Sequence, residues 1–351
     1  MSLRYHLWKF LLERDIFLGL LIFGFFSMLA DFFSDMGKND TAASIRIIGL
    51  FIFLLVLFAD FILNLLFSED IMIPVFLTED DKKTSRNAFQ MFIDSNKKLN
   101  SGYKLLEKTS MIKMEDLILR LDNNPRASDD PTNWTAGWRE LITKWENDID
   151  KELRVNPFFN HGYCYHISPR VPLVICFALG ATVKLERPLI LYHKDKTNKF
   201  HSVINLSNPR EVIYEPKNPV VFPVTNPENL GDLKGGDKLI LYLIISPSHP
   251  ENFEFPDEGQ NASYASIVYA CDLHPDEDWL PYVQNIYRIA LQVIDRYDKV
   301  EIRMRCPDVI AFALGMAFSR RGHIDLSNHR CEGTYVSVFS LSEIERKMYF
   351  C

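Results

Sequence analysis

The stretch PLVICFALGATV, Pro172–Val183, recurs 135 residues further along the chain as PDVIAFALGMAF, Pro307–Phe318. Seven of the nine positions from Pro172 to Gly180 are identical in the two copies. Extending the comparison over residues 166–206 without a gap gives 13 identities in 41 positions. A match of this length without a gap indicates a duplication, so we expect two halves that share one fold.

Each copy contains the same succession of patterns. A short strand leads into a loop with an arginine and then into an apolar helix that opens with proline, where the missing N–H leaves no hydrogen bond unmade. Two more strands follow in each copy. The predicted strands are Tyr163–Ser168, Leu189–His193 and Phe200–Leu206 in the first copy, and Lys299–Arg305, Ile324–Asn328 and Tyr335–Leu341 in the second.

The connection of strand, helix and strand is a right-handed parallel crossover in nearly all proteins. The apolar strand Lys238–Ile245 and the amphipathic helix Leu280–Tyr297 extend the second copy. The sequence therefore predicts an α/β fold in which two tandem Rossmann-type halves pack as a pseudo-dimer within one chain.

Two apolar runs, Ile16–Phe33 and Ile47–Phe67, precede this region. Each is long enough, or nearly so, to cross about 30 Å of hydrocarbon at a rise of about 1.5 Å per residue. The polar loop 34–44 between them is short, so we expect an antiparallel transmembrane hairpin over residues 1–67. Lys and Arg are more frequent outside this loop than within it, which places both termini in the cytoplasm of a multi-pass membrane protein.

Polar residues inside the hairpin carry a further expectation. Asp60 and Asn64 lie four residues apart and share one face of the second helix. A carboxylate in mid-membrane costs roughly 2.5–3.5 kcal/mol, so it faces protein or water. This polar face suits either a hydrogen bond between helices or the lining of a pore built from several chains. Asp31 near the end of the first helix can meet Arg46 on the second.

The segment 68–133 is charged and has helical spacing in Ala88–Leu106 and Met114–Leu121. We interpret it as a helical cytosolic linker, because the turn-rich NNPRASDDPTN, Asn123–Asn133, marks a boundary at its end. The duplicated domain then covers residues 134–351, and its two halves cover about 134–235 and 236–351.

Composition and motifs exclude several classes of protein. The net charge of −7 excludes a general binder of DNA or RNA, which would be strongly basic. The six cysteines are scattered without a C-x-x-C pair, so neither a zinc site nor a disulfide scaffold is expected. The sequence holds no H-E-x-x-H, G-x-S-x-G or Walker motif. We therefore expect no catalytic residue, no metal and no resident cofactor.

Ligands of open α/β sheets bind beyond the carboxyl ends of the strands, where helix N-termini attract phosphate. Positive and hydrogen-bonding side chains gather at these ends, which suits a compact polyanion that carries bases. Each of them also fits a structural ion pair or a solvated strand end. The candidate ligand-binding residues are Ser168, Arg170, His193 and Lys194 in the first half, and Ser246, Ser248, Arg303, Arg305 and Asn328 in the second.

The paired units that contain PLVICFALG and PDVIAFALG resemble the two CARF-like halves of a SAVED domain, over roughly residues 135–351. A SAVED domain that follows two transmembrane helices resembles the membrane effectors of CBASS, a bacterial antiphage system. The resemblance implies that a cyclic di- or trinucleotide, made by a partner nucleotidyltransferase, binds the domain. It also implies that binding promotes homo-oligomerisation, and that the membrane segment then disrupts the bilayer and stops the growth of the infected cell.

Two alternatives stay open at this point. The chain could be a membrane-anchored enzyme that cleaves its cyclic ligand, or a membrane-tethered binding module without toxicity. Recovery of intact ligand after incubation disfavours the enzyme. Loss of membrane potential upon ligand addition separates the effector from the tethered module.

Overall fold

The computed structural model describes residues 15–66, 71–122, 130–156, 159, 162–182, 187–217, 220, 223–246, 262–329 and 335–343; within them it leaves aside the side chains of residues 15–22, 54–66, His329 and Phe339. The chain divides into two compact units, Met1–Ile71 and Met72–Cys351.

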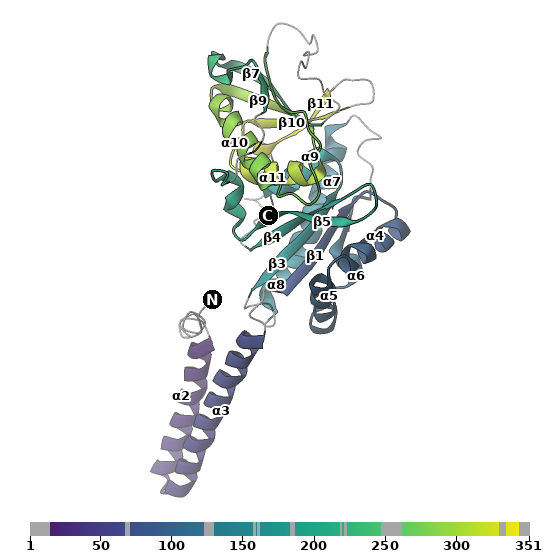
Figure 1. Ribbon diagram of the computed structural model, residues 1–351. Coiled ribbons are helices and arrows are strands. Elements are labelled where there is room, and N and C mark those ends of the chain that lie inside the picture. The colour runs from purple at the N-terminus through teal and green to yellow at the C-terminus, as the bar shows by residue number, and fades with distance from the viewer. Residues whose placement is uncertain are drawn as a thin grey trace. The chain divides into compact units, whose positions relative to one another are not determined.

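The smaller unit is a hairpin of two helices, α2 (Asp15–Asp35) and α3 (Asn39–Leu66), which lie side by side (Figure 1). The second helix begins at Asn39, earlier than the apolar run Ile47–Phe67 suggested, because the polar residues before that run are also helical. Among the residues that the structure describes, none of the helices combines the length and the apolar character that crossing a bilayer requires. The side chains of Asp60 and Asn64 lie outside the description.

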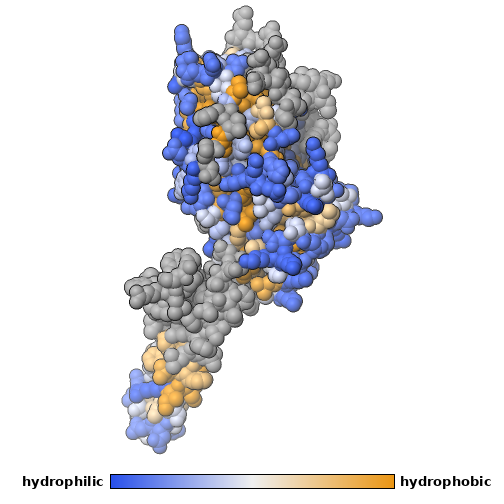
Figure 2. All heavy atoms as spheres, viewed as in Figure 1, coloured by the Kyte–Doolittle hydropathy of each residue, from blue (hydrophilic) through white to orange (hydrophobic). Residues whose placement is uncertain are grey.

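Contacts across the hairpin hold α2 and α3 close together. The Arg46 guanidinium donates to the Asp31 carboxylate, which confirms the expected pair. A Cβ atom at Gly49 would lie 2.5 Å from Cβ of Phe26, so glycine permits the close approach. The outward faces remain apolar, and Figure 2 shows apolar residues along the helices with polar ones at the turn. The strongly exposed apolar side chains are Phe25, Met28, Phe32, Ile47 and Phe51.

The larger unit contains two sheets, in which most strands run parallel. The five-stranded sheet has the order β2-β1-β3-β4-β5, and the six-stranded sheet has the order β11-β10-β9-β7-β8-β6. The strands of the first sheet are β1 (Ile71–Thr78), β2 (Ile118–Arg120), β3 (Tyr163–Arg170), β4 (Leu189–Lys194) and β5 (Phe200–Leu206). Those of the second are β6 (Val224–Asn226), β7 (Gly236–Ile245), β8 (Ser263–Tyr269), β9 (Tyr297–Arg305), β10 (Ile324–His329) and β11 (Tyr335–Ser340).

The two sheets repeat one topology, as the duplication predicts. Without β6, the second order matches the first strand by strand, and β3–β4 and β9–β10 are both parallel pairs joined through a helix. The antiparallel β4–β5 ladder shifts register between Leu191 and Tyr192, and the β10–β11 ladder shifts between Leu326 and Ser327. These irregularities lie 135 residues apart, which is the offset of the sequence repeat. The mixed α/β fold with two duplicated, mostly parallel sheets is therefore confirmed.

The expected boundary at residue 134 does not coincide with a break in the fold. Residues 68–133 supply β1 and β2 of the first sheet, together with α4 (Lys82–Asp94), α5 (Lys97–Thr109) and α6 (Met114–Leu117). The first half therefore begins at β1. Strand β1 is hard to recognise because Pro74 stands in its middle, and proline is unusual in a strand that has neighbours on both sides.

Helices occupy the space between the two sheets (Figure 1). They are α9 (Leu173–Thr182), α11 (Asp308–Phe318), α10 (Leu280–Ile294) and α7 (Pro131–Lys144). Helix α7 continues through a π-helical turn (Trp145–Asp150) into α8 (Lys151–Val155). Contacts cross between the halves in a reciprocal manner, since α10 packs on β5 and α7 packs on β11. Helices α4 and α5 lie on the opposite side of the first sheet, where Phe92 packs against Tyr192.

Helices α9 and α11 form the centre of this layer, and almost all of their side chains are buried. A Cβ atom at Gly180 would lie 2.0 Å from the carbonyl oxygen of Phe312, and one at Gly315 would lie 2.0 Å from that of Phe177. The two F-A-L-G segments thus pack against each other and are related by a pseudo-two-fold axis. This contact requires glycine in both copies, because any side chain would meet backbone atoms.

We expect Gly180→Ala to destabilise the larger unit by about 3 kcal/mol, the upper end of what overpacking usually costs. The matched control is Gly137→Ala, whose new methyl would meet only the movable end of the Leu121 side chain at 2.7 Å. Urea denaturation of the full chain, followed by tryptophan fluorescence, measures both. A Gly180→Ala protein as stable as the wild type would contradict the central role of this contact.

Candidate ligand-binding cleft

A cleft of about 530 Å³ lies at the carboxyl ends of β7 and β9, where the β4–β5 hairpin of the first half approaches the second half. Both halves contribute to its walls. The lining residues are His193, Asp195, Lys196, Ile245, Ser246, Cys271, Asp272, Leu273, His274, Pro275, Trp279, Arg305, Cys306 and Pro307.

The first wall is the turn between β4 and β5. The Asp195 carboxylate accepts hydrogen bonds from the backbone N–H groups of Thr197 at 2.7 Å and Lys199 at 2.9 Å. These bonds, led by the one from Lys199, hold the pKa of Asp195 well below its usual value. Asn198 adopts a φ of 66°, in the left-handed region that asparagine tolerates. The turn therefore presents a fixed anion and the neighbouring Lys196 to the cleft.

The second wall is the loop between β8 and α10. Trp279 at its end is buried, and its backbone N–H donates to the carbonyl oxygen of Val203 on β5 at 2.7 Å. The Trp279 indole N–H donates to the carbonyl oxygen of His274 at 2.9 Å, which shapes the loop. The His193 ring lies with its centroid 4.8 Å from that of Trp279. Burial lowers the pKa of His193, which favours the neutral imidazole at the floor of the cleft.

Three of the predicted ligand-binding residues line this cleft: His193, Ser246 and Arg305. Arg305 is the last residue of β9 and is exposed, while Ser246 directly follows β7. The cations Lys196 and Arg305 come from opposite halves, and the anions Asp195 and Asp272 stand among them. The cleft is therefore neither plugged nor acidic, and it offers both charges to a ligand.

Arg170 and Lys194 are not among the residues that line the cleft. Arg170 pairs with Asp80, which follows β1, at 3.4 Å. The Lys194 ammonium lies 5.8 Å from the ring centroid of Phe200, and burial together with the Arg170 charge lowers the pKa of Lys194. Because successive side chains of a strand point to opposite faces, Lys194 points away from the face on which its neighbour His193 lies. The side chains of His193 and Lys194 therefore lie on opposite faces of the sheet, although the two residues are neighbours in the sequence.

Arg303 is buried and belongs to a charge network in the second sheet. Its Nε donates to Glu301 at 2.7 Å and its Nη1 donates to the Tyr242 hydroxyl at 2.6 Å, while the guanidinium lies 4.6 Å from the ring centroid of Tyr335. The Lys238 ammonium also forms an ion pair with Glu301, with Nζ 2.6 Å from Oε2. Burial alone would raise the pKa of Glu301, and the hydrogen bonds from these cations lower it below its usual value. The structure thus gives Arg303 a position inside the protein and not in the cleft.

The remaining predicted residues are also outside the lining of the cleft. Ser168 is buried on the face of β3 that carries His166, and among the described residues its hydroxyl has no hydrogen-bond partner. Asn328 lies on β10 opposite Val336. Ser248 lies outside the described residues.

The sequence analysis did not identify the cleft residues that lie in turns and loops beyond the last residue of a strand. Asp195 and Lys196 belong to a hairpin turn, and Asp272, His274 and Trp279 belong to the loop before α10. The two segments approach each other only because the helices of both halves interlock. One signal in the sequence could have indicated these residues. The turn 195–199 directly follows β4, and the loop 271–279 follows the apolar strand β8, so both segments begin at the end of a strand.

Comparison with known proteins gives similarity at the level of structure. No family model matches the chain, and no curated protein matches it. The chain is similar to a Cap4 SAVED/CARF-domain containing receptor of Acinetobacter baumannii solved with the cyclic trinucleotide 3'3'3'-cAAA, with a TM-score of 0.47 and 13% identity over 86% of this chain and 62% of that chain. It is also similar to the Cap4 receptor of Moraxella osloensis, with a TM-score of 0.49 and 13% identity over 87% of this chain and 63% of that chain.

The chain spans less than two thirds of the length of these receptors. The A. baumannii receptor solved with 2'3'3'-cAAA gives a TM-score of 0.44 and 14% identity over 81% of this chain and 55% of that chain. At these TM-scores the similarity by itself assigns no ligand to this chain, and the cleft has to be judged by its own residues.

We expect Arg303→Met to destabilise the larger unit by about 3–5 kcal/mol, because it removes the buried guanidinium from one carboxylate oxygen of the buried Glu301. The control is Arg321→Met, which removes a partly exposed ion pair with Asp295 and should cost no more than about 1 kcal/mol. Chemical denaturation at neutral pH compares the two. Equal losses in both variants would refute the buried network as a structural element.

Proposed function

We propose that this chain is a receptor for a cyclic oligonucleotide, which binds in the cleft between the two halves. The observation that carries the proposal is the position of Lys196 and Arg305 on opposite walls of one cleft at a strand-end edge. Its volume of about 530 Å³ falls within the range of about 300–1,000 Å³ that small-molecule sites occupy.

The lining residues suit the parts of a nucleotide ring. Arg305 can hold a phosphate with two parallel hydrogen bonds, and Lys196 can approach a second phosphate as a point charge. The hydroxyl of Ser246 can donate to a phosphate oxygen. The neutral ring of His193 offers a flat surface to a base, and Asp272 can accept hydrogen bonds from a ribose hydroxyl or an exocyclic amine. A ligand that carries only phosphates would offer no hydrogen-bond donor to the Asp272 carboxylate and no base to the His193 ring.

The proposed site is asymmetric although the fold is duplicated. Arg170 occupies the position in the first half that corresponds to Arg305, and it pairs with Asp80. The position of His193 is taken by Asn328 in the second half. We therefore place the ligand at one strand-end edge, where both halves provide side chains, and expect the edge of the first sheet to contribute less.

The N-terminal hairpin is proposed to act as the effector part. Its exposed phenylalanine and isoleucine side chains form an apolar surface that favours lipid over water. On this proposal the protein belongs to a CBASS-type antiphage response at the bacterial inner membrane. Nucleotide binding brings several chains together, and the hairpins, with Asp60 and Asn64 as their polar face, disrupt the bilayer. We propose a signalling role without catalysis, so the nucleotide should be recovered intact.

We expect a cyclic di- or trinucleotide to raise the melting temperature of the full chain, because a ligand that binds only the folded state stabilises it by mass action. Arg305→Ala should weaken the affinity by roughly 10- to 100-fold, the usual loss for a charged hydrogen bond. Arg170→Ala, which alters the corresponding arginine of the other half, should retain affinity within a few-fold. A thermal-shift screen followed by calorimetry measures both.

Two results would count against this assignment. One is the absence of any stabilising cyclic di- or trinucleotide for the wild-type chain. The other is a greater loss of affinity in Arg170→Ala than in Arg305→Ala, which would move the site to the edge of the first sheet.

A vesicle experiment tests the hairpin. We expect the full chain to bind liposomes, and the combined replacement of Phe25, Phe32 and Phe51 by serine to abolish binding, because each exposed phenylalanine loses up to about 1.5–3 kcal/mol of apolar burial. The control is Met111→Ser, which alters an apolar residue of the larger unit that is even more exposed than the three phenylalanines. Flotation of the triple variant with the vesicles at wild-type levels would disprove the role of this surface.

A further inference from the structure

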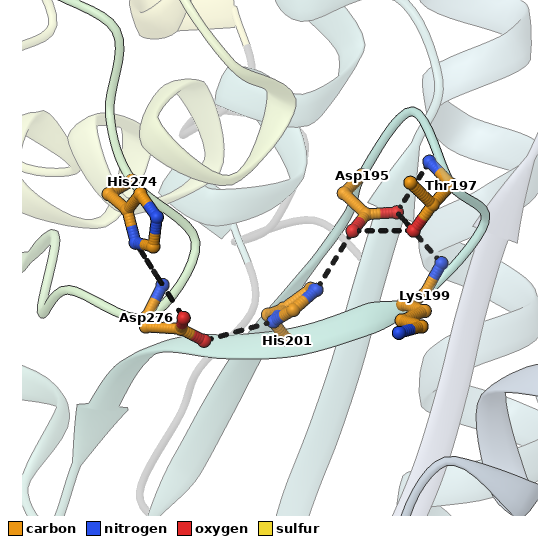
Figure 3. Close-up of polar contacts among 6 residues, drawn as sticks. All are labelled: Asp195, Thr197, Lys199, His201, His274 and Asp276. Atoms are coloured by element: carbon orange, nitrogen blue, oxygen red, sulfur yellow. Dashed lines mark hydrogen bonds and ion pairs between the residues drawn. The ribbon is translucent and has the colours of Figure 1, made fainter.

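A histidine connects the two walls of the cleft. His201 on β5 places Nε2 3.0 Å from a carboxylate oxygen of Asp195, on the turn of its own hairpin, and Nδ1 3.5 Å from a carboxylate oxygen of Asp276, on the loop of the other half (Figure 3). Its side chain is 22% exposed, whereas that of Asp276 is 75% exposed. A single imidazole thus bridges a carboxylate from each half of the duplicated fold.

Each end of this bridge is anchored within its own segment. The turn donates backbone N–H groups to Asp195, as described above, so the carboxylate cannot follow the histidine if the walls separate. On the other side, the backbone N–H of Asp276 donates to Nδ1 of His274 at 3.3 Å, which fixes the loop locally. Asp195 and His274 themselves line the cleft, so the bridge stands directly at its border.

We propose that His201 is a positioning residue that clasps the β4–β5 hairpin to the loop before α10 and thereby holds the cleft in its ligand-binding shape. The nucleotide part of this inference depends on the function proposed above, whereas the clasp itself does not. The charged or titratable groups around His201 are Asp195 on its hairpin, His193 opposite it on β4, and Asp276 and His274 on the loop.

The histidine of the clasp is not repeated in the second copy. The residue 135 positions after His201 is Val336, which offers no hydrogen bond to a carboxylate. His193 and His201 stand directly opposite each other in the β4–β5 ladder, and therefore on one face of the hairpin. Both face the loop of the other half, one through the Trp279 ring and one through Asp276. The two copies of the repeat thus differ in sequence at the position where the walls of the cleft meet.

The reactivity of two cysteines in the cleft can be used to detect a change in its shape in the absence of a ligand. Cys271 and Cys306 line the cleft and are partly buried, and burial raises the pKa of both thiols. A thiol with a raised pKa reacts slowly with maleimide, because the thiolate is the nucleophile. If the loop leaves the hairpin, both thiols gain water and should react faster.

The experiment measures the alkylation of each cysteine by N-ethylmaleimide in the full chain, with the sites separated by peptide mass mapping. We expect His201→Gln and Asp276→Asn each to accelerate the alkylation of Cys271 by about fivefold, the factor that a partly exposed ion pair supplies. The double variant should react no faster than either single one, because both remove the same contact. His201→Arg, which can still reach both carboxylates, should stay near the wild-type rate.

Two controls separate the clasp from general loosening. Arg321→Met removes a partly exposed ion pair with Asp295, neither residue of which lines the cleft, and it should leave the rates unchanged. The buried Cys176 should stay unreactive in every variant, since it is enclosed in α9 and reacts only if the unit unfolds. Affinity for the nucleotide found in the thermal-shift screen is then measured for His201→Gln, and we expect it to fall by a similar factor.

The outcomes distinguish the two proposals. Unchanged alkylation of Cys271 in Asp276→Asn, which alters an exposed side chain and leaves the core intact, overturns the clasp whether or not a nucleotide binds. So does additive acceleration in the double variant, or reaction of Cys176 together with Cys271. Accelerated alkylation in a chain that binds no cyclic nucleotide supports the clasp and overturns the proposed function alone.

Discussion

The structure of the larger unit depends on one contact, in which the glycine of each F-A-L-G copy rests against a phenylalanine carbonyl of the other. Gly180 and Gly315 allow the helix backbones of α9 and α11 to touch, so the two sheets can share a single layer of helices. The contact is reciprocal, like a two-fold interface between subunits, although both surfaces belong to one chain. The remaining helices then reach across, α10 onto β5 and α7 onto β11.

This symmetry of the scaffold does not extend to its surface. Close packing of two equal halves places two strand-end edges at equivalent positions, and the side chains at these edges differ. At one edge Arg170 is paired with Asp80, and at the other Arg305 borders a cleft together with Lys196 from the opposite half. His201 bridges two carboxylates at the cleft, and Val336 takes its position in the second copy. A duplicated core thus supports one asymmetric cleft, as expected when packing constrains the interior more strongly than the loops.

Charge is used in two different ways within the same strand. Glu301 and Arg303 are buried in the second sheet, next to the partly exposed Lys238 and the hydroxyls of Ser327 and Tyr242. Each charge has a partner at hydrogen-bond distance. Two residues later, Arg305 is exposed at the end of the strand. The first arrangement satisfies the demand that buried charges be paired, and the second places a cation at the border of the cleft. Strand position, and not residue type, separates the two roles.

The duplication, its offset, the parallel crossovers, the burial of both central helices and the Asp31–Arg46 pair could be predicted from the amino-acid sequence, because they follow from local periodicity and from the repeated residues. The positions of His193, Ser246 and Arg305 at strand ends could be predicted in the same way. The assignment of β1 and β2 to the first half required the folded structure, since Pro74 and a three-residue strand leave no periodic signal. Only the tertiary structure, too, brought the turn at Asp195 beside the loop at Asp276. Those segments meet through the interlocking of helices far apart in the chain, and contacts of that kind depend on packing geometry that no local pattern encodes.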